Sequence, residues 1–297
     1  MSFTPPPEFG SRIRRGEPLS RHTSWHVGGP ADIFFMPESR TDLIAFLQQL
    51  PPDVPLLWLG LGSNLLVRDG GVRGVVIATR EALNQLERRG ERGVHAEAGV
   101  PCAKLARACA RWNLGPAEFF TGIPGTVGGA LAMNAGAFGG ETWPQVEGVE
   151  TIDRHGEVRQ RAAAEYRFSY RHIEPPAVEE WFLAAQFSFA GASSEPDTRA
   201  LLERRRQTQP IGEWSCGSVF TNPPGDHAAR LIEAAGLKGH RIGGAVVSAR
   251  HANFIINEGA ASASDIEMLI DQVQSEVERQ HGRRLVPECR IVGEAPR

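Results

Sequence analysis

The chain has 297 residues, of which 41% are hydrophobic and 23% charged, and its formal net charge is −3. This length suits two or three lobes, and the weak negative charge argues against a general nucleic-acid or membrane-surface binder. No apolar run approaches the roughly 18 residues of a membrane span. The N-terminal segment 1–17 has no apolar signal-peptide core, so we expect a frayed tail there and a cytoplasmic protein.

Regular elements in the front half follow from the spacing of apolar residues. Residues 38–50 form a predicted amphipathic helix, with Ser39 as its cap and Asp42 three residues further on. Residues 54–60 and 73–79 are typical of buried strands on either side of a glycine-containing loop. The front half is therefore expected to mix helices and strands.

A second helix is predicted after Pro101, which we place in its first turn. Cys102 and Cys109 fall on its apolar face, so we expect buried thiols there and no metal ligands. His22 and His26 have the spacing of a zinc pair on a helix, but a Gly-Gly-Pro sequence follows at once and breaks any helix. We predict no metal site.

The middle of the chain indicates a hairpin and a linker. Residues 149–160 alternate as two strands that turn between Asp153 and Gly156. Residues 182–190 are expected to form a further strand, and residues 191–198 a linker.

A more helical lobe is predicted to start near Asp197 with an arginine-rich helix. Its later elements are recognised by their caps and ends. They are a helix with Asp226 as its cap and Gly236 as its end, a longer helix with a capping box of Ser264 and Glu267 that ends at His281 and Gly282, and a closing strand at 288–293. The fold class expected from these elements is α+β.

The stretch GIPGTVGGALAMNAGAFGGE, residues 122–141, contains seven glycines and four alanines. Such a segment is not expected to form a good helix or strand. Together with the loop at 59–66 it supplies backbone N–H groups that cradle anions. Neither loop matches a P-loop or a GxGxxG motif. Glycines that merely form turns remain an alternative, but two such loops favour a long phosphate-bearing ligand, and a dinucleotide fits.

Several motifs in this order resemble the family of UDP-N-acetylenolpyruvoylglucosamine reductases. The resemblance covers nearly the whole chain after about residue 18, and GSVFTNP together with GIPGTVGGALAMNAGA is highly specific. The motifs are HTSWHVGGPADIF, LGLGSNLLVRDGGVRGVVI, GIPGTVGGALAMNAGAFGGE, YRFSYRHI, CGSVFTNPPGDHAARLIEAAGLKG, HANFIIN and LVPECRIVGE.

The resemblance implies an FAD-binding fold of the vanillyl-alcohol and p-cresol oxidase type, followed by an α+β substrate-binding domain. The implied division is a first FAD-binding subdomain at 18–80 completed by 286–297, a second at 81–193, and a substrate domain at 197–285. FAD would be held non-covalently, by residues of both glycine-rich loops. These are Gly62, Ser63, Asn64, Leu65, Gly122, Ile123, Pro124, Gly125, Gly128, Gly129, Asn134, Ala135 and Gly136. The resemblance thus implies that these two loops are poor in side chains because FAD lies against their backbone.

The reaction implied by the resemblance is the NADPH-dependent reduction of UDP-N-acetylglucosamine enolpyruvate to UDP-N-acetylmuramate, in peptidoglycan precursor synthesis. Hydride would reach the alkene through FAD, and charge would develop beside the substrate carboxylate. Arg171 would stabilise that carboxylate, since a guanidinium binds it in a bidentate manner. Ser218 would donate the proton, and Glu288, with a raised pKa, would orient or protonate the carboxylate. Cys216 would point to the other face of an extended chain.

Substrate-binding roles are implied for Tyr170, Asn222 and Arg206, the last chosen from a run of three arginines. Only about forty-five residues separate Arg171 from Ser218, which resembles the family class without a longer, tyrosine-bearing lid. His22 stands where many members have Asn and is given no role. We expect a small-molecule substrate, no nucleic-acid or membrane partner, and a monomer.

Two alternatives remain at this point. The first is a sugar or alcohol oxidase of the same flavin superfamily. The absence of His and Cys from the segment 122–141 weakens it, because such oxidases often tether FAD covalently. The second is a nucleotide-sugar-binding or flavin-binding regulator without catalytic activity.

Overall fold

A computed structural model describes residues 3–193 and 195–296. Four residues lie outside the described ones. They are residues 1 and 2 of the expected tail, Ser194 of the expected linker and residue 297 of the expected closing segment. The chain divides into two compact units. The first unit contains residues 1–15, 33–61 and 74–202, and the second contains 16–32, 62–73 and 203–297.

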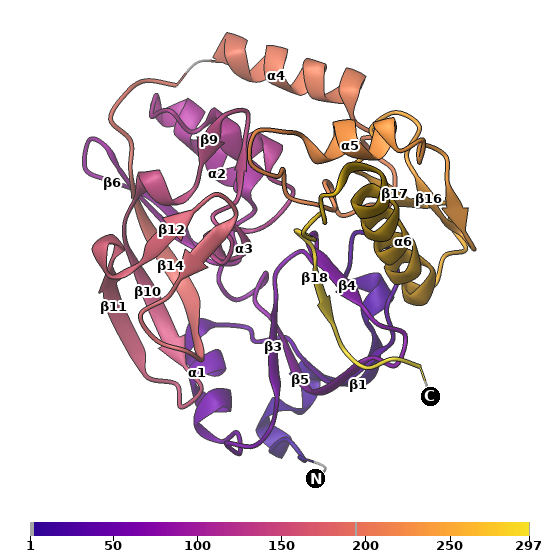
Figure 1. Cartoon of the computed structure of the whole chain (residues 1–297). Coiled ribbons are helices and arrows are strands. Elements are labelled where there is room, and N and C mark those ends of the chain that lie inside the picture. Colours follow the sequence, from indigo (N-terminus) through magenta and orange to yellow (C-terminus); the bar gives the residue numbers. More distant parts are fainter. Residues whose placement is uncertain (1–2, 194, 297) are drawn as a thin grey trace. The chain divides into compact units, whose positions relative to one another are not determined.

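A mixture of helices and strands runs through the whole described chain (Figure 1), as expected for an α+β protein. The helices are α1 (Arg40–Gln48), α2 (Cys102–Trp112), α3 (Val127–Leu131), α4 (Glu195–Thr208), α5 (Ala228–Ala234) and α6 (Ala263–His281). The strands before the middle of the chain are β1 (Ile13–Pro18), β2 (Pro30–Phe35), β3 (Leu56–Leu59), β4 (Leu65–Val67), β5 (Val72–Ala78), β6 (Leu86–Arg89), β7 (Gly93–Glu97), β8 (Gly136–Ala137) and β9 (Gly140–Glu141). The later strands are β10 (Val146–Asp153), β11 (Val158–Ala162), β12 (Arg167–Ser169), β13 (His172–Glu174), β14 (Glu180–Ser188), β15 (Arg241–Ile242), β16 (Ala245–Val247), β17 (Ile255–Asn257) and β18 (Arg290–Val292).

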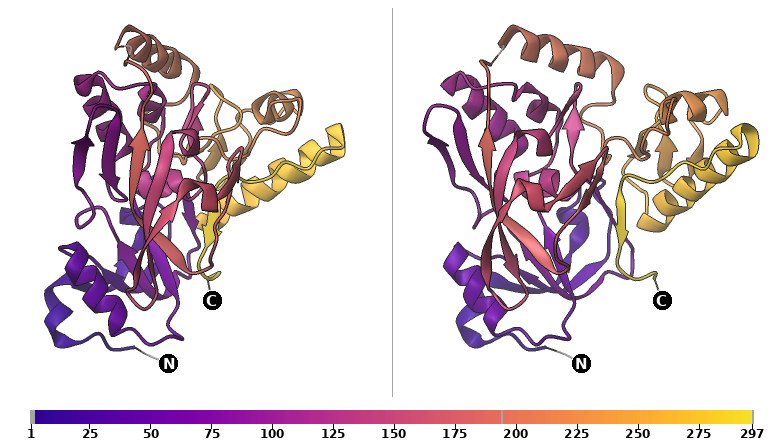
Figure 2. Two further views of the ribbon diagram at one scale, coloured as in Figure 1. Left: turned by 90° about the vertical axis from the view of Figure 1, so that its left-hand side faces the viewer. Right: turned by 60° about the vertical axis from the view of Figure 1, so that its left-hand side comes forward.

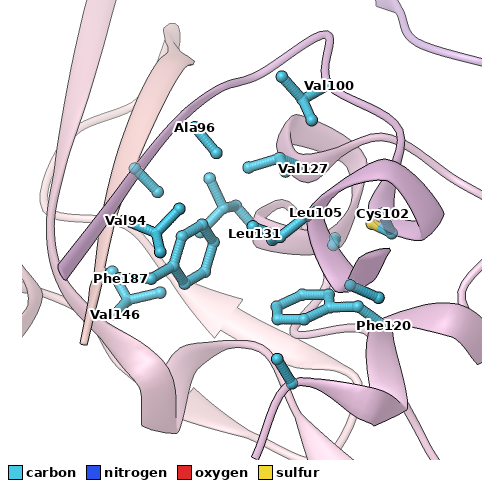
Figure 3. Close-up of a cluster of buried hydrophobic side chains, with 14 of the residues drawn as sticks. Val94, Ala96, Val100, Cys102, Leu105, Phe120, Val127, Leu131, Val146 and Phe187 are labelled. Carbon is cyan, nitrogen blue, oxygen red and sulfur yellow. The ribbon is translucent and has the colours of Figure 1, made fainter. Parts of the chain in front are cut away.

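The main sheet of the first unit has five strands in the order β11-β10-β14-β7-β6, and its neighbours are antiparallel (Figure 2). The alternation of apolar residues in β7 and β14 turns one face of this sheet toward α2 and α3. Side chains of the strands and of both helices fill the space between them, as Figure 3 shows for Val94, Phe187, Leu105 and Leu131. Cys102 and Cys109 are buried in this core, as predicted.

A four-stranded sheet has the order β1-β2-β5-β3, and β3 lies parallel to β5. Within the first unit α1 buries Leu43, Phe46 and Leu47 among the apolar residues of these strands. Ser39 caps α1 as predicted, because its hydroxyl accepts a hydrogen bond from the Asp42 backbone N–H at 3.1 Å. The predicted hairpin is also confirmed, since β10 and β11 pair antiparallel and Gly156 N–H closes the turn on Asp153 O at 3.1 Å.

The expectation of a frayed N-terminal tail is wrong for residues 7–17. Residues Pro7–Arg12 form a 3-10 helix, and β1 follows it directly. Phe9 is only 2% exposed and its ring meets those of Phe35 and Phe46 edge-on, at centroid distances of 5.8 and 5.3 Å. An aromatic side chain with such partners holds the segment in place despite its prolines.

In the second unit α6 packs on α5 and on the sheet β15-β16-β17, with the apolar face that the sequence predicts. β18 lies parallel to β4, with Arg290 opposite Leu65, so the predicted closing strand is confirmed. α6 ends at His281 and Gly282 as predicted, where Gly282 takes the left-handed conformation that glycine favours.

The predicted capping box of α6 is wrong, because the helix begins two residues earlier than expected. Ser262 and Asp265 form the box. Ser264 donates its backbone N–H and its hydroxyl to Asp69, at 2.9 and 2.7 Å. Glu267 instead accepts hydrogen bonds from Arg68 at 2.7 to 3.1 Å.

Two other helix starts also differ from the predictions. Pro101 precedes α2 as its N-cap instead of lying in the first turn. The N-cap of α5 is His227, while Asp226 pairs with Arg230 and the Ala228 N–H is accepted by the Asn222 side chain at 3.1 Å. Gly236, with φ of +74°, ends α5 as predicted.

Candidate functional site

The glycine-rich stretch 122–141 contains only the five-residue helix α3 and the two-residue strands β8 and β9, which agrees with the expectation that it forms no good helix or strand. Thr126 caps α3, and its hydroxyl accepts the Gly129 N–H at 3.3 Å. The N–H groups of Val127 and Gly128 donate to Val100 O and Ala98 O, each at 2.8 Å. Neighbouring backbone therefore stabilises a helix that glycine and alanine alone would form poorly.

Four glycines of this stretch are required by the packing of the protein itself. A Cβ on any of them would come within 3.0 Å of neighbouring protein atoms, which is closer than real Cβ atoms come. The contacts would be Gly122 with Ala137 Cβ at 2.5 Å, Gly128 with Ala98 Cβ at 2.9 Å, Gly136 with Gly140 O at 2.3 Å, and Gly140 with the Phe119 ring at 2.6 Å. A ligand against the backbone is therefore not needed to explain the missing side chains at these four positions.

Gly129 differs from these four glycines. It is exposed in the first turn of α3, and a Cβ there would meet nothing closer than Thr126 Oγ1 at 3.7 Å. Its missing side chain leaves a surface that a ligand can approach.

Replacing Gly129 and Gly128 by Val should separate ligand approach from packing. Gly129→Val should lower the flavin content of the purified protein and leave the thermal unfolding temperature of the flavin-free protein nearly unchanged. Gly128→Val should destabilise the protein by about 1–3 kcal/mol, because its branches would overlap Ala98. Flavin absorbance per protein and thermal unfolding measure the two effects. Full flavin content in Gly129→Val would show that the ligand does not lie against this residue.

The predicted catalytic residue Arg171 lies in the turn between β12 and β13, next to Tyr170. Its φ of +57° is unusual for a residue other than glycine, and such conformations are often found at functional sites. Its Nη2 donates to Gly136 O at 2.7 Å, and its guanidinium carbon lies 5.1 Å from the Tyr170 ring centroid. The first unit thus brings together Arg171, the 47% exposed Tyr170 and the end of the glycine-rich loop.

Asn134, predicted to bind the cofactor, is 0% exposed, and its amide group bonds with the protein. Its Nδ2 donates to Glu141 Oε2 and to Ser169 O, both at 2.9 Å. Its Oδ1 accepts the Trp143 backbone N–H at 3.0 Å. Both amide protons are therefore used within the first unit, which leaves the side chain a structural role.

The second unit brings the predicted residues Asn64, Glu288 and Ser218 close to one another. The Asn64 side chain donates to Glu288 O at 3.0 Å. The Glu288 N–H donates at 2.7 Å to the carbonyl of Val219, the residue that follows Ser218. These three residues are far apart in the sequence, and no local pattern connects them. The resemblance assigned Asn64 to the cofactor and Ser218 and Glu288 to catalysis, and these roles stay predictions.

The loop before Asn64 has a backbone that requires glycine. Gly62 has φ of +62°, and a Cβ there would lie 2.0 Å from His22 O. Ser63 follows at the turn, and Leu65 begins β4. The loop therefore directs Asn64 toward the strand that follows Glu288.

The segment that carries Ser218 is fixed by a residue that the sequence analysis did not assign. Asn253, which is buried, accepts the Phe220 N–H on Oδ1 at 2.9 Å and donates Nδ2 to Phe220 O at 2.8 Å. Its own carbonyl accepts the Val219 N–H at 2.8 Å. An Asn within the apolar run of HANFIIN was the signal that could have revealed it, because a buried amide needs partners.

Cys216 is buried, but the expectation that its side chain points to the other face of an extended chain is wrong. Gly217, with φ of +84°, bends the chain between Cys216 and Ser218, so the two side chains do not simply alternate along a strand. Burial in the apolar core of the second unit, next to Cys289, raises the pKa of the Cys216 thiol well above its usual value.

Two predicted substrate residues are engaged in local contacts. Asn222 accepts the N–H at the start of α5. The Arg206 side chain is 71% exposed on α4 and lies 3.8 Å from Glu203. The neighbouring Arg205 is half-buried, which lowers its pKa, and it bonds with Gln209 at 2.9 Å.

The histidine pair of the sequence is used in other contacts. His22 Nε2 lies 2.9 Å from Glu17 Oε1, and the His26 ring stacks on Trp214 with centroids 4.4 Å apart. Among residues 3–193 and 195–296, no group of three or more His, Cys, Asp or Glu side chains is arranged to hold a metal ion.

No helix in that same part of the chain is long and apolar enough to cross a membrane.

Family models match two parts of the chain. The model for the FAD binding domain matches residues 31–161. The model for the UDP-N-acetylenolpyruvoylglucosamine reductase C-terminal domain matches residues 209–292, which include Ser218 and Glu288. An FAD-binding domain followed by this C-terminal domain agrees with the predicted fold class.

Curated proteins and a solved structure resemble nearly the whole chain. A UDP-N-acetylenolpyruvoylglucosamine reductase of Alkalilimnicola ehrlichii is 60% identical over 286 residues, which cover 95% of each protein. The Methylococcus capsulatus reductase of the same name is 56% identical over 94% of this chain and 92% of its own length. The crystal structure of UDP-N-acetylenolpyruvylglucosamine reductase from Thermus caldophilus is 34% identical, with a TM-score of 0.80 over 94% of this chain and 98% of that one.

Proposed function

Because the chain belongs to the UDP-N-acetylenolpyruvoylglucosamine reductase family, we propose that it reduces UDP-N-acetylglucosamine enolpyruvate to UDP-N-acetylmuramate at the expense of NADPH. The chain is an FAD-dependent oxidoreductase of this family, with an FAD binding domain at residues 31–161. The proposal adds the electron donor, the catalytic residues and a place in cytoplasmic peptidoglycan precursor synthesis.

The described residues fit a flavin cofactor. Gly129 presents an exposed turn of α3 to which a large planar or phosphate-bearing group has access. The loop Gly62–Asn64 has the compact backbone typical of anion-binding loops. These loops would hold FAD without a covalent bond, and bound FAD supplies the hydride that the alkene receives.

Three side chains of this chain would carry the remaining chemistry. Arg171 would bind the substrate carboxylate and stabilise the charge that develops beside it. Ser218 would hold and donate the proton for the carbon next to the carboxylate. A serine hydroxyl is weakly acidic, but a carbanion of this kind is a strong base, so an aligned alcohol suffices. Glu288 would orient or protonate the carboxylate.

The observation that carries the proposal is the grouping of Asn64, Glu288 and Ser218 in the second unit. The link runs from the Asn64 side chain to Glu288 O at 3.0 Å, and from Glu288 N–H to Val219 O at 2.7 Å. A regulator that only binds a flavin or a nucleotide sugar needs no such link between the segments that carry Ser218 and Glu288. Tyr170, Asn222 and Arg206 remain proposed substrate contacts.

The domain division proposed from the resemblance differs in outline from the two compact units. We retain it as a functional proposal, with FAD held by 18–80, 81–193 and 286–297 and the substrate by 197–285. The strand pairing of β18 with β4 supports the assignment of the C-terminal segment to the first FAD-binding subdomain. A monomer is also part of this proposal.

The purified protein should be yellow and should release intact FAD into solution on heating or acid treatment. Release without proteolysis is expected because the two glycine-rich loops bind through backbone and shape, with no covalent tether proposed. Absorbance and chromatography of the supernatant against an FAD standard measure it. A colourless protein that cannot be reconstituted with FAD would overturn the proposal.

Two assays distinguish this function from the alternatives. Mass spectrometry should find that the enolpyruvyl substrate gains two hydrogens when NADPH is supplied. An oxidase would consume oxygen with a sugar or alcohol and leave the enolpyruvyl compound unchanged. A regulator would bind ligand and yield no product.

A further inference from the structure

We propose that Glu141 is a positioning residue for Arg171, acting through the buried amide of Asn134. The proposal deepens the function proposed above and rests on it for its kinetic test. Its structural part concerns the first unit alone.

The first link runs from Glu141 to Asn134. Glu141 Oε2 accepts a hydrogen bond from Asn134 Nδ2 at 2.9 Å. Asn134 is fully buried and has φ of +47°, a conformation that its surroundings must maintain. A carboxylate acceptor makes a stronger hydrogen bond than a neutral one, so Glu141 fixes the orientation of the amide.

The second link runs from Asn134 to the hairpin that carries Arg171. The same Nδ2 donates to Ser169 O at 2.9 Å. Ser169 pairs with His172, and Arg171 lies in the turn between them with φ of +57°. The Asn134 amide therefore holds the base of the turn on which Arg171 stands.

A third link reaches the guanidinium itself. Gly136 O accepts from Arg171 Nη2 at 2.7 Å, and Gly136 pairs with Glu141 across the two-stranded ladder β8–β9. A Cβ on Gly136 would lie 3.1 Å from both Arg171 Nη1 and Glu141 Cγ, so the two side chains lie against the same glycine. Glu141 thus holds the base of the Arg171 turn through Asn134, and its backbone pairs with the glycine whose carbonyl accepts from the guanidinium.

The first test measures the position of Arg171 without reference to activity. Phenylglyoxal labels accessible arginines, and mass spectrometry of the Arg171 peptide gives the labelling rate in the flavin-loaded protein. In Glu141→Ala this rate should rise several-fold, since the turn that carries Arg171 loses the fixed Asn134 amide at its base. The exposed Arg167 should keep its rate, as should Arg171 in the control Glu147→Ala, which removes an exposed glutamate on β10. An unchanged Arg171 rate in Glu141→Ala would overturn the proposal.

The second test is a double-mutant cycle on reoxidation of the reduced flavin by the enolpyruvyl substrate. Glu141→Ala should slow it by at least about tenfold, the scale expected for a misplaced catalytic group. In an Arg171→Ala background the same change should slow it by less than about twofold, because Glu141 acts through Arg171. Glu141→Gln, which keeps an acceptor for Asn134, should restore most of the rate. Equal slowing in both backgrounds would overturn the proposal.

The two tests fail in different ways. If Arg171 labelling rises but the parent protein never uses the enolpyruvyl substrate, the proposed function is wrong and the positioning role stands. If the parent turns over and the cycle is additive, the positioning role is wrong and the function stands. Should Glu141→Ala fail to fold, Glu141→Asp replaces it in both tests, because it retracts the carboxylate by one methylene and keeps its charge.

Discussion

Ser218→Ala should slow reoxidation of the reduced flavin by the enolpyruvyl substrate by roughly 10²–10⁴, the range expected for loss of a general acid. Flavin reduction by NADPH should stay close to the parent rate, because that step requires no proton at the substrate carbon. Stopped-flow absorbance of the flavin follows both steps on one sample. The backbone around residue 218 should be unchanged, since Asn253 and Glu288 hold it through main-chain atoms of Val219 and Phe220.

The control for this prediction is Cys216→Ala, two residues earlier in the chain. Cys216 is buried in the apolar core of the second unit, so it should not reach the substrate, and its loss should change neither half-reaction much. If Ser218→Ala is reoxidised as fast as the parent, Ser218 is not the donor. A water molecule or Glu288 would then have to take its place.

Arg171→Ala should slow the substrate half-reaction by roughly 10²–10³, the scale for removing one group that stabilises developing charge. Flavin reduction by NADPH should again be largely spared. Arg171→Lys should give an intermediate rate, because an ammonium keeps the charge but loses the bidentate geometry. The left-handed backbone at residue 171 should tolerate both changes equally, so a difference between them reports on the guanidinium.

The matched control is Arg167→Ala, which removes an exposed arginine from β12 of the same hairpin. It should leave both half-reactions unchanged, because a general loss of surface charge is not the cause invoked for Arg171. If Arg167→Ala and Arg171→Ala behave alike, the role assigned to Arg171 is wrong.

Local features of the fold were predictable where the sequence itself contains the partner. Ser39 lies three residues before Asp42, and the hairpin of β10 and β11 closes within one turn, so both predictions are confirmed. The start of α6 was missed although its capping box, Ser262 and Asp265, is local, because Ser264 and Glu267 have the same spacing. Only the structure shows that Asp69, almost two hundred residues away, takes the hydrogen bonds of Ser264. The ordered N-terminal segment was missed for the same kind of reason, since the partners of Phe9 come from other elements.

In the candidate site, too, local features could be predicted from the sequence, whereas contacts with distant residues could not. The resemblance assigned Asn64 to cofactor binding and Ser218 and Glu288 to catalysis. Hydrogen bonds of the second unit join Asn64 to Glu288, and Glu288 to Val219, the residue after Ser218. It gave no reason to single out Glu141, whose importance lies in one hydrogen bond to a buried amide. It also gave every glycine of the glycine-rich loop the same explanation. In the structure Gly128 is required by packing against Ala98, whereas Gly129 has room for a side chain. Such differences depend on tertiary neighbours, which sequence spacing does not contain.

The most direct test of the proposed function is NADPH consumption by the purified, flavin-loaded protein with and without UDP-N-acetylglucosamine enolpyruvate. The proposal predicts slow background oxidation of NADPH alone and a large increase when the enolpyruvyl substrate is added, with one substrate molecule reduced per NADPH consumed. NADPH consumption that is unaffected by this substrate would contradict it.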